Sequence, residues 1–176
     1  LPKTLQAYLT LLAAEQTLPA GHILLQPGQY ARKMYFIEKG LAMKYYVRDA
    51  LKIVTWFMYE NDFFLSVDSF FNQKPSDEYI QLLEETKLFS LTHQQFATLT
   101  KGFPEAASIA EQIQRMYYIK EKNLIRRLKS LSNEDKYSYL RRNHPQIVRR
   151  VPLQYIASFL DMTPQHLSKI RRNLKN

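Results

Sequence analysis

Between Leu18 and Leu91 the chain is divided into short apolar or alternating segments, and this pattern limits the possible fold more than any other feature. The segments cover residues 23–25, 34–37, 41–47, 53–58, 79–83 and 87–91. Turn residues such as Gly21, Pro27-Gly28 and Lys39-Gly40 separate them. Short strands with turns at this spacing are typical of antiparallel sandwiches and rolls. We therefore expect an antiparallel β-roll, preceded by a short helix within residues 1–16, where Leu5, Leu9 and Leu12 have helical spacing.

After the roll, Thr92 is suited to cap a helix through about Thr100, and a long helix is predicted next, because residues 104–131 contain no internal Gly or Pro. At 1.5 Å per residue such a helix is about 42 Å long, which is long for one small domain. Its apolar residues recur at steps of three, four or seven, and the stripe can pack on the roll, on a second copy of the chain, or on both. The candidate dimer contacts are Ala110, Ile113, Tyr117, Leu124 and Leu128.

The last part of the chain predicts further helices with clear start signals. Ser132 is suited to cap a helix that ends near Asn143, before Pro145. Pro152 begins a helix through about Leu160, and a tight turn at Asp161-Met162 follows. Thr163 is then an N-cap, Pro164 suits the first helical position, and Leu167, Ile170 and Leu174 form an inward stripe. The whole pattern predicts an α+β protein.

Positive charge is concentrated in the same part. Residues 115–176 carry 15 Lys and Arg against four acidic residues, a balance of +11, whereas residues 1–114 have 10 basic and 12 acidic residues, a balance of −2. Such asymmetry indicates a module that binds a polyanion, because Lys and Arg that neutralise phosphates release counterions. The alternative interpretation is a solvated basic helical face.

Two short helices joined by a tight turn, with the second one basic, predict a helix-turn-helix whose second helix lies in the major groove of duplex DNA. Gln and Lys side chains there can pair with base edges, and other polar residues can contact phosphates. The residues expected to contact DNA are Thr163, Gln165, His166, Ser168, Lys169, Arg171 and Arg172.

Several classes of function are excluded or disfavoured. The chain has no Cys, which removes disulfide scaffolds, cysteine-bound zinc, thiolate-held iron–sulfur clusters and cysteine nucleophiles. His22, His93, His144 and His166 are scattered without metal-ligand spacing, and Glu84 and Glu85 are neighbours on a predicted strand, so they face opposite sides. We expect no catalytic residues, no metal and no enzyme activity. No apolar run is long enough to span a bilayer, so we expect a cytoplasmic protein without membrane contact.

The sequence resembles the Crp–Fnr family of transcription regulators over nearly its whole length. The matching segments are residues 18–29 and 34–40, the long helix after Pro104, and above all residues 150–172. The resemblance implies a cyclic-nucleotide-binding-like sensor domain over residues 1–103, a linking and dimerisation helix over 104–131, and a helix-turn-helix domain over 132–176 without the usual wing. It further implies a homodimer on a palindromic operator in double-stranded DNA, with RNA polymerase as a partner.

The phosphate-binding cassette departs from the pattern of the cyclic-AMP-binding members. Leu65-Ser66 replaces their Gly-Glu pair, and Ser76-Asp77 replaces their Arg-Ser pair. An Asp near the phosphate position repels an anion. We therefore expect no binding of cyclic AMP at this cassette, and either another effector or none.

The residues around this cassette have two possible roles. They can form a pocket for a less charged or apolar effector, or the aromatic ones can simply fill the roll. The candidate pocket residues are Phe63, Phe64, Leu65, Ser66, Asp68, Ser69, Ser76, Asp77 and Tyr79. A rival function for the whole chain is a non-catalytic interaction or scaffold domain whose basic helices contact RNA or an acidic partner.

Overall fold

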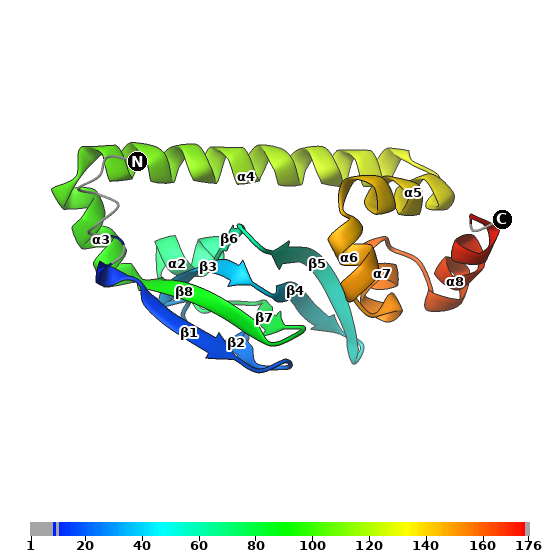
Figure 1. Cartoon of the computed structure of the whole chain (residues 1–176), viewed down its shortest axis with the longest axis horizontal. Coiled ribbons are helices and arrows are strands. Elements are labelled where there is room, and N and C mark those ends of the chain that lie inside the picture. The colour runs from blue at the N-terminus through cyan, green and yellow to red at the C-terminus, as the bar shows by residue number, and fades with distance from the viewer. Residues whose placement is uncertain (1–8, 10, 175–176) are drawn as a thin grey trace.

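Two antiparallel four-stranded sheets form the first half of the protein in the computed structural model, which describes residues 9 and 11–174 (Figure 1). One sheet has the order β1-β8-β3-β6 and the other β2-β7-β4-β5. The strands are β1 (Ala14–Leu18), β2 (Ile23–Leu25), β3 (Lys33–Lys39), β4 (Leu41–Arg48), β5 (Leu51–Tyr59), β6 (Phe63–Phe64), β7 (Tyr79–Leu82) and β8 (Thr86–Thr92). The predicted antiparallel roll is confirmed, and each segment selected from the sequence forms one of these strands.

The prediction for the N-terminus was partly wrong. Leu5 lies outside the described residues, and the helical residues Leu9 and Leu12 pack near Leu99 and Ala106. The chain then changes to strand β1, which pairs in antiparallel register with β8 from Ala14 opposite Ser90 to Leu18 opposite Thr86. Backbone pairing with the edge of β8 therefore replaces the helix that was expected to continue to Gln16.

The helices follow in the order expected from the sequence, with two additions. A six-residue helix α2 (Val67–Asn72) interrupts the strands, and Pro145 begins a further short helix rather than only ending the previous one. The others are α3 (His93–Gly102), α4 (Pro104–Ser130), α5 (Asn133–Asn143), α6 (Pro145–Arg150), α7 (Leu153–Phe159) and α8 (Pro164–Asn173). Figure 1 shows α4 running along the length of the roll, with α5 to α8 gathered at one end.

The second sheet is covered on both faces. Ala42, Ile80 and Leu82 point into the core between the two sheets. Met43 and Phe57 belong to a second core that the sheet shares with the C-terminal helices. An extra residue, Thr55, lies in β5 where the register with β4 shifts, and this bulge brings Val54 and Phe57 onto the same face. The C-terminal helices are therefore packed against the outside of the roll.

Gly40, between β3 and β4, is a position that only glycine can occupy. Its φ is +128°, and a Cβ atom would lie 2.3 Å from Oγ1 of Thr86. Its amide donates to Oε1 of Glu60 at 2.9 Å. The close approach of this turn to Thr86 thus requires a residue without a side chain.

Among the residues that the structure describes, no helix combines the length and the apolar character needed to cross a membrane.

Candidate nucleic-acid interface

Helix α8 begins with the signals that the sequence predicted. The Thr163 hydroxyl accepts a hydrogen bond from the His166 amide at 3.2 Å, and Pro164 occupies the first turn. Leu167 and Ile170 are 0% and 2% exposed and anchor one side of the helix in the C-terminal core. This local pattern fixes which side of α8 faces outward.

The outward side of α8 is polar and cationic. Gln165, His166, Lys169 and Arg172 are exposed, whereas Ser168 and Arg171 are half-buried. His166 also contacts the start of α5, where its Nε2 lies 3.3 Å from Nδ2 of Asn133. The residues predicted to contact DNA therefore lie on one helix and its N-cap, although Thr163 uses its hydroxyl to cap the helix.

A tight turn fixes α8 against α7. Asp161 adopts a left-handed backbone with φ of +56°, and the Met162 amide donates to the Ala157 carbonyl at 3.0 Å. Ala157 is completely buried, so the small side chain allows the two helices to approach closely. The result is a short helix pair that presents one basic helix at the end of the molecule (Figure 1).

Helix α7 is joined to the roll through strand β5. The Ser158 hydroxyl donates to the Lys52 carbonyl at 2.8 Å and accepts from the Val54 amide at 3.0 Å. Because β5 is the last strand of its sheet, this serine satisfies backbone groups that have no strand partner. The rings of Phe57 and Phe159 pack edge to face with centroids 5.2 Å apart.

An ion cluster adds a second connection between the roll and the helices. Arg150, at the end of α6, donates to both Glu60 oxygens at 2.7 and 2.8 Å. It also binds both oxygens of Glu84, with its Nε at 3.2 Å from one of them. Hydrogen bonds from Arg150 lower the pKa of Glu60 to about 2 and raise the pKa of the arginine above its usual value. The sequence suggested Glu84 only as one member of an unsuitable carboxylate pair with Glu85. In the structure its carboxylate binds Arg150 of the C-terminal helices.

Helix α4 turns its predicted apolar stripe toward the rest of the same chain. Leu124 is 7% exposed, Leu128 packs against the C-terminal core, and Ala110, Ile113 and Tyr117 are half-buried. The Tyr117 hydroxyl donates to Asp62 at 3.1 Å and accepts from the Phe63 amide at 3.0 Å, and burial raises its pKa to about 12. Packing within one chain, one of the alternatives left open by the periodicity, accounts for Tyr117, Leu124 and Leu128 of this stripe.

Other apolar side chains of α4 face away from the roll and were not selected from the sequence. They are Met116, Tyr118, Ile119 and Ile125, which are between 46% and 64% exposed. They interrupt a charged and polar pattern, so periodicity alone did not identify them. Any partner helix would meet these residues first.

The residues predicted to form an effector pocket do not surround one cavity. Ser69 and Ser76 use their hydroxyls within the fold, to Ala31 and to Glu78 respectively. Phe64 is buried in the core, Leu65 packs beside it, and Phe63 packs on Phe36. Tyr79 stacks on Tyr45, while Asp68 bonds Asn72.

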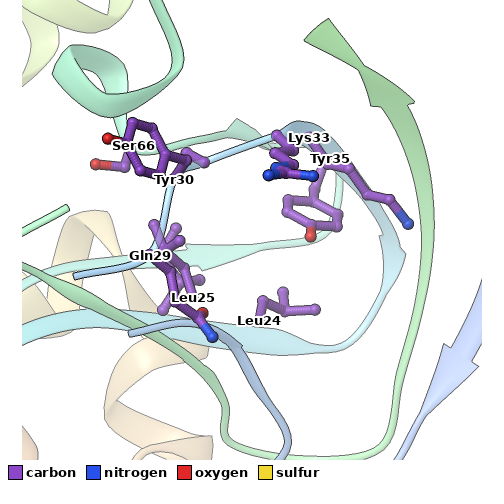
Figure 2. A pocket seen from close by; sticks show the side chains of 10 residues that line it. Leu24, Leu25, Gln29, Tyr30, Lys33, Tyr35 and Ser66 are labelled. Carbon is purple, nitrogen blue, oxygen red and sulfur yellow. The ribbon is translucent and has the colours of Figure 1, made fainter. Parts of the chain in front are cut away.

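Asp77 is exposed, and of all the predicted residues only Ser66 lines the pocket of about 410 Å³ that the roll contains (Figure 2). The other lining residues come from β2, the segment between β2 and β3, the start of β3, and Ile80 of β7, and none of them was predicted as a pocket residue. Within the described ranges, 9 and 11–174, no three acidic or histidine side chains come together as they would around a metal ion.

Comparison with known proteins identifies the domain type. Residues 15–102, half of the chain, match the family profile described as "Cyclic nucleotide-binding domain". No curated protein sequence matches the chain.

Solved structures are similar over nearly the whole chain. The c-di-GMP-responsive global regulator CLP of Xanthomonas campestris superposes with a TM-score of 0.75 at 13% identity, covering 98% of this chain and 91% of CLP. FixK2 from Bradyrhizobium japonicum gives 0.76 at 14% identity, with 93% and 84% covered. A protein from Eubacterium rectale assigned to the crp/fnr family of transcriptional regulators gives 0.75 at 14% identity, with 99% and 84% covered. At these identities the likeness establishes the fold.

Proposed function

The chain belongs to the cyclic nucleotide-binding domain family and has the fold of Crp/Fnr regulators, and from this premise we propose that it is a transcription regulator that binds duplex DNA as a homodimer. The roll serves as the sensor, and α7 and α8 act as a helix-turn-helix. The operator is a palindrome, since two copies related by a twofold axis read two half-sites about one helical turn apart.

The observation that supports this function most strongly is the outward side of α8. Leu167 and Ile170 anchor the helix, and this leaves Gln165, Lys169 and Arg172 exposed on its other side. Gln165 lies in the first turn, where a recognition helix penetrates deepest, and its amide can pair with adenine. Lys169 can pair with guanine or bind phosphate, and Arg172 adds a phosphate contact.

The exposed apolar side of α4 supports the homodimer. Met116, Tyr118, Ile119 and Ile125 are exposed along the middle of a long helix, and Tyr118 and Ile125, seven residues apart, lie on the same face of it. A second copy of α4 would bury these side chains, because apolar area removed from water stabilises association. The dimer contact therefore belongs to this outward side and not to the inward stripe of Leu124 and Leu128.

A change in the position of the strands of the roll reaches α8 through direct contacts in this arrangement. Ser158, Phe159 and Arg150 connect the helix pair to β5 and to the strand ends beside it. A ligand that changes the position of these strands would also change the position of α8 relative to its partner in the dimer, a population shift between two spacings. Cyclic AMP is not the ligand at the cassette, since the Ser76 hydroxyl is held by Glu78 and Asp77 adds a negative charge.

Selection of binding sites from random duplex DNA tests the proposal. The full chain should enrich a palindrome with half-sites about 10 base pairs apart. Enrichment of an asymmetric site, or of none, would contradict a homodimeric DNA reader. Enrichment of single-stranded RNA in a parallel selection would favour the rival interaction domain.

A further inference from the structure

The first turns of α5 and α8 meet through one pair of side chains. Nδ2 of Asn133, in α5, lies 3.3 Å from Nε2 of His166, in α8. Asn133 is half-buried and His166 is exposed. The contact therefore fixes an accessible imidazole between the helix that is proposed to enter the major groove and the helix beside it.

Both residues of this contact belong to capped helix ends. The Ser132 hydroxyl caps α5 and accepts from the Asp135 amide at 3.2 Å. The Thr163 hydroxyl caps α8 and accepts from the amide of His166 itself at 3.2 Å. Capped first turns hold the backbone of both residues in place, so little conformational entropy is lost when the imidazole meets a ligand.

His166 lies on the flank of α8 and not on its outermost line. Each step along a helix turns by about 100°. His166 is therefore one step from the completely buried Leu167, whereas Gln165 is two steps from it and lies on the far side. The outermost line of a helix in the major groove faces the base edges, and its flank faces the sugar–phosphate backbone that borders the groove. We therefore expect a phosphate opposite this imidazole.

The contact with Asn133 determines which ring nitrogen of His166 carries the proton. The side-chain nitrogen of asparagine is only a donor, so Nε2 of the imidazole accepts from it. A neutral imidazole then has its proton on Nδ1, and this N–H can donate to a phosphate oxygen. In the other neutral form Nδ1 is an acceptor and cannot bond to a phosphate oxygen.

Two carboxylates share the first turn of α5 with Asn133. The Asp135 carboxylate accepts from the Ser132 hydroxyl at 2.6 Å and so takes part in the cap, and Glu134 is exposed. Both charges oppose the approach of a phosphate, and Lys169 of α8 acts in the opposite direction. A donor in the correct form is needed in such a mixed field, because the local charge alone does not attract the backbone.

We propose that Asn133 is a positioning residue for DNA binding, which holds the proton of the His166 imidazole on Nδ1 so that the ring donates to a backbone phosphate of the operator. The inference rests on the proposed function and deepens it. It assigns His166 to the residues that fix the register of the protein on the duplex, and it adds a residue of α5 to those of the helix-turn-helix.

The form of the imidazole can be measured without DNA. Long-range ¹H–¹⁵N spectra at pH 8.5, well above the range in which histidine usually takes up a proton, distinguish a proton on Nδ1 from one on Nε2. His166→Gln identifies the signals of this ring. The unmodified chain should show the Nδ1–H form, and Asn133→Ala should change the ratio of the two forms. An Nε2–H form in the unmodified chain, or an unchanged ratio in Asn133→Ala, would overturn the positioning role.

Asn143→Ala is a matched control for this measurement. Asn143 is the last residue of α5, and its side-chain nitrogen donates to the Tyr139 carbonyl at 2.9 Å. The control therefore removes an asparagine from the same helix without touching the imidazole. It should leave the ring spectrum of His166 unchanged, and the same change in both asparagine variants would contradict a specific contact.

Fluorescence anisotropy at pH 8.5 then tests the phosphate contact, with the selected palindrome and a scrambled duplex. His166→Ala should weaken the binding of both duplexes by a similar factor, about threefold to tenfold, because a phosphate contact carries no sequence information. Asn133→Ala should weaken both by the same factor or less. The double variant should bind like His166→Ala alone, because Asn133 acts through the imidazole.

The possible results separate this inference from the proposed function. A loss confined to the palindrome would mean that His166 reads a base, and additive losses would mean that Asn133 binds DNA by itself. Either result, or full binding by His166→Ala, would overturn the inference while leaving a DNA-binding protein. Failure of the unmodified chain to bind either duplex would contradict the proposed function, and with it the phosphate contact, whatever the ring spectrum shows.

Discussion

Arg150 and Glu60 lie 90 residues apart in the sequence and form a two-pronged ion pair, with N–O distances of 2.7 and 2.8 Å. The arginine ends α6, and the glutamate follows β5, so the pair joins the C-terminal helices to the roll. Glu84 completes the cluster from the turn before β8. The helix pair is thereby held to the sensor by charge as well as by the shared apolar core.

Replacement of Arg150 should weaken the whole fold. The variant Arg150→Ala leaves two carboxylates close together without a counter-charge, and we expect the free energy of unfolding to fall by about 2 kcal/mol. The neighbouring Arg149 is exposed, so Arg149→Ala should stay within about 0.5 kcal/mol of the unmodified chain. Urea unfolding measures both, and equal effects would show that the cluster does not stabilise the fold.

Acid should remove part of this stabilisation. The pKa of Glu60 is lowered from 4.5 to about 2 in the folded chain. A lowered folded-state pKa means that the ionised carboxylate stabilises the fold above about pH 4.5 and that this contribution is lost as the pH falls toward 2. Urea unfolding of Glu60→Gln and of the unmodified chain should therefore differ at pH 7, and the difference should shrink as the pH falls from about 4.5 toward 2. A difference that stays constant over this range would disprove the linkage.

Loss of the Ser158 hydroxyl should loosen the contact between α7 and β5. In Ser158→Ala the Val54 amide and the Lys52 carbonyl lose their partner, and we expect a loss of about 1–2 kcal/mol of unfolding free energy. Ser108→Ala, on an exposed turn of α4, provides the control and should have little effect. Hydrogen exchange of the Val54 amide gives a local readout: unchanged protection in Ser158→Ala would contradict this role.

The two sides of α4 should respond differently to substitution. Ile119→Glu/Ile125→Glu places charges on the outward side and should convert a dimer to a monomer in size-exclusion chromatography with light scattering. Leu124→Ala removes a buried side chain and should reduce stability by about 2–4 kcal/mol while leaving the dimer. A chain that is monomeric without substitution at micromolar concentration would refute the homodimer.

Local patterns in the sequence were sufficient to predict most of the fold. Turn residues and alternation located the strands of the roll, and Thr163-Pro164 with Leu167 and Ile170 located α8 and its buried side. These signals act over a few residues, so they can be recognised without knowledge of the rest of the chain. The family resemblance added the order of the parts, and the match of residues 15–102 confirms the domain type.

Features that depend on distant parts of the chain could not be predicted in this way. The period of α4 revealed an apolar stripe, but only packing shows that the roll and C-terminal helices cover Tyr117 and Leu124. The strand β1 forms because the edge of β8 is available. Arg32 and Lys33 line the pocket because the β2–β3 segment is held against Ser69 and Ser76. No local sequence pattern predicts this contact.

Fluorescence anisotropy with the selected palindrome and a scrambled duplex measures whether α8 reads base sequence. The unmodified chain should prefer the palindrome, and Gln165→Ala or Lys169→Ala should each reduce that preference by about 1–3 kcal/mol while binding of the scrambled duplex changes less. Lys39→Ala, on the roll, should leave the preference unchanged. Equal affinity of the unmodified chain for both duplexes, or the same preference in all variants, would contradict the account.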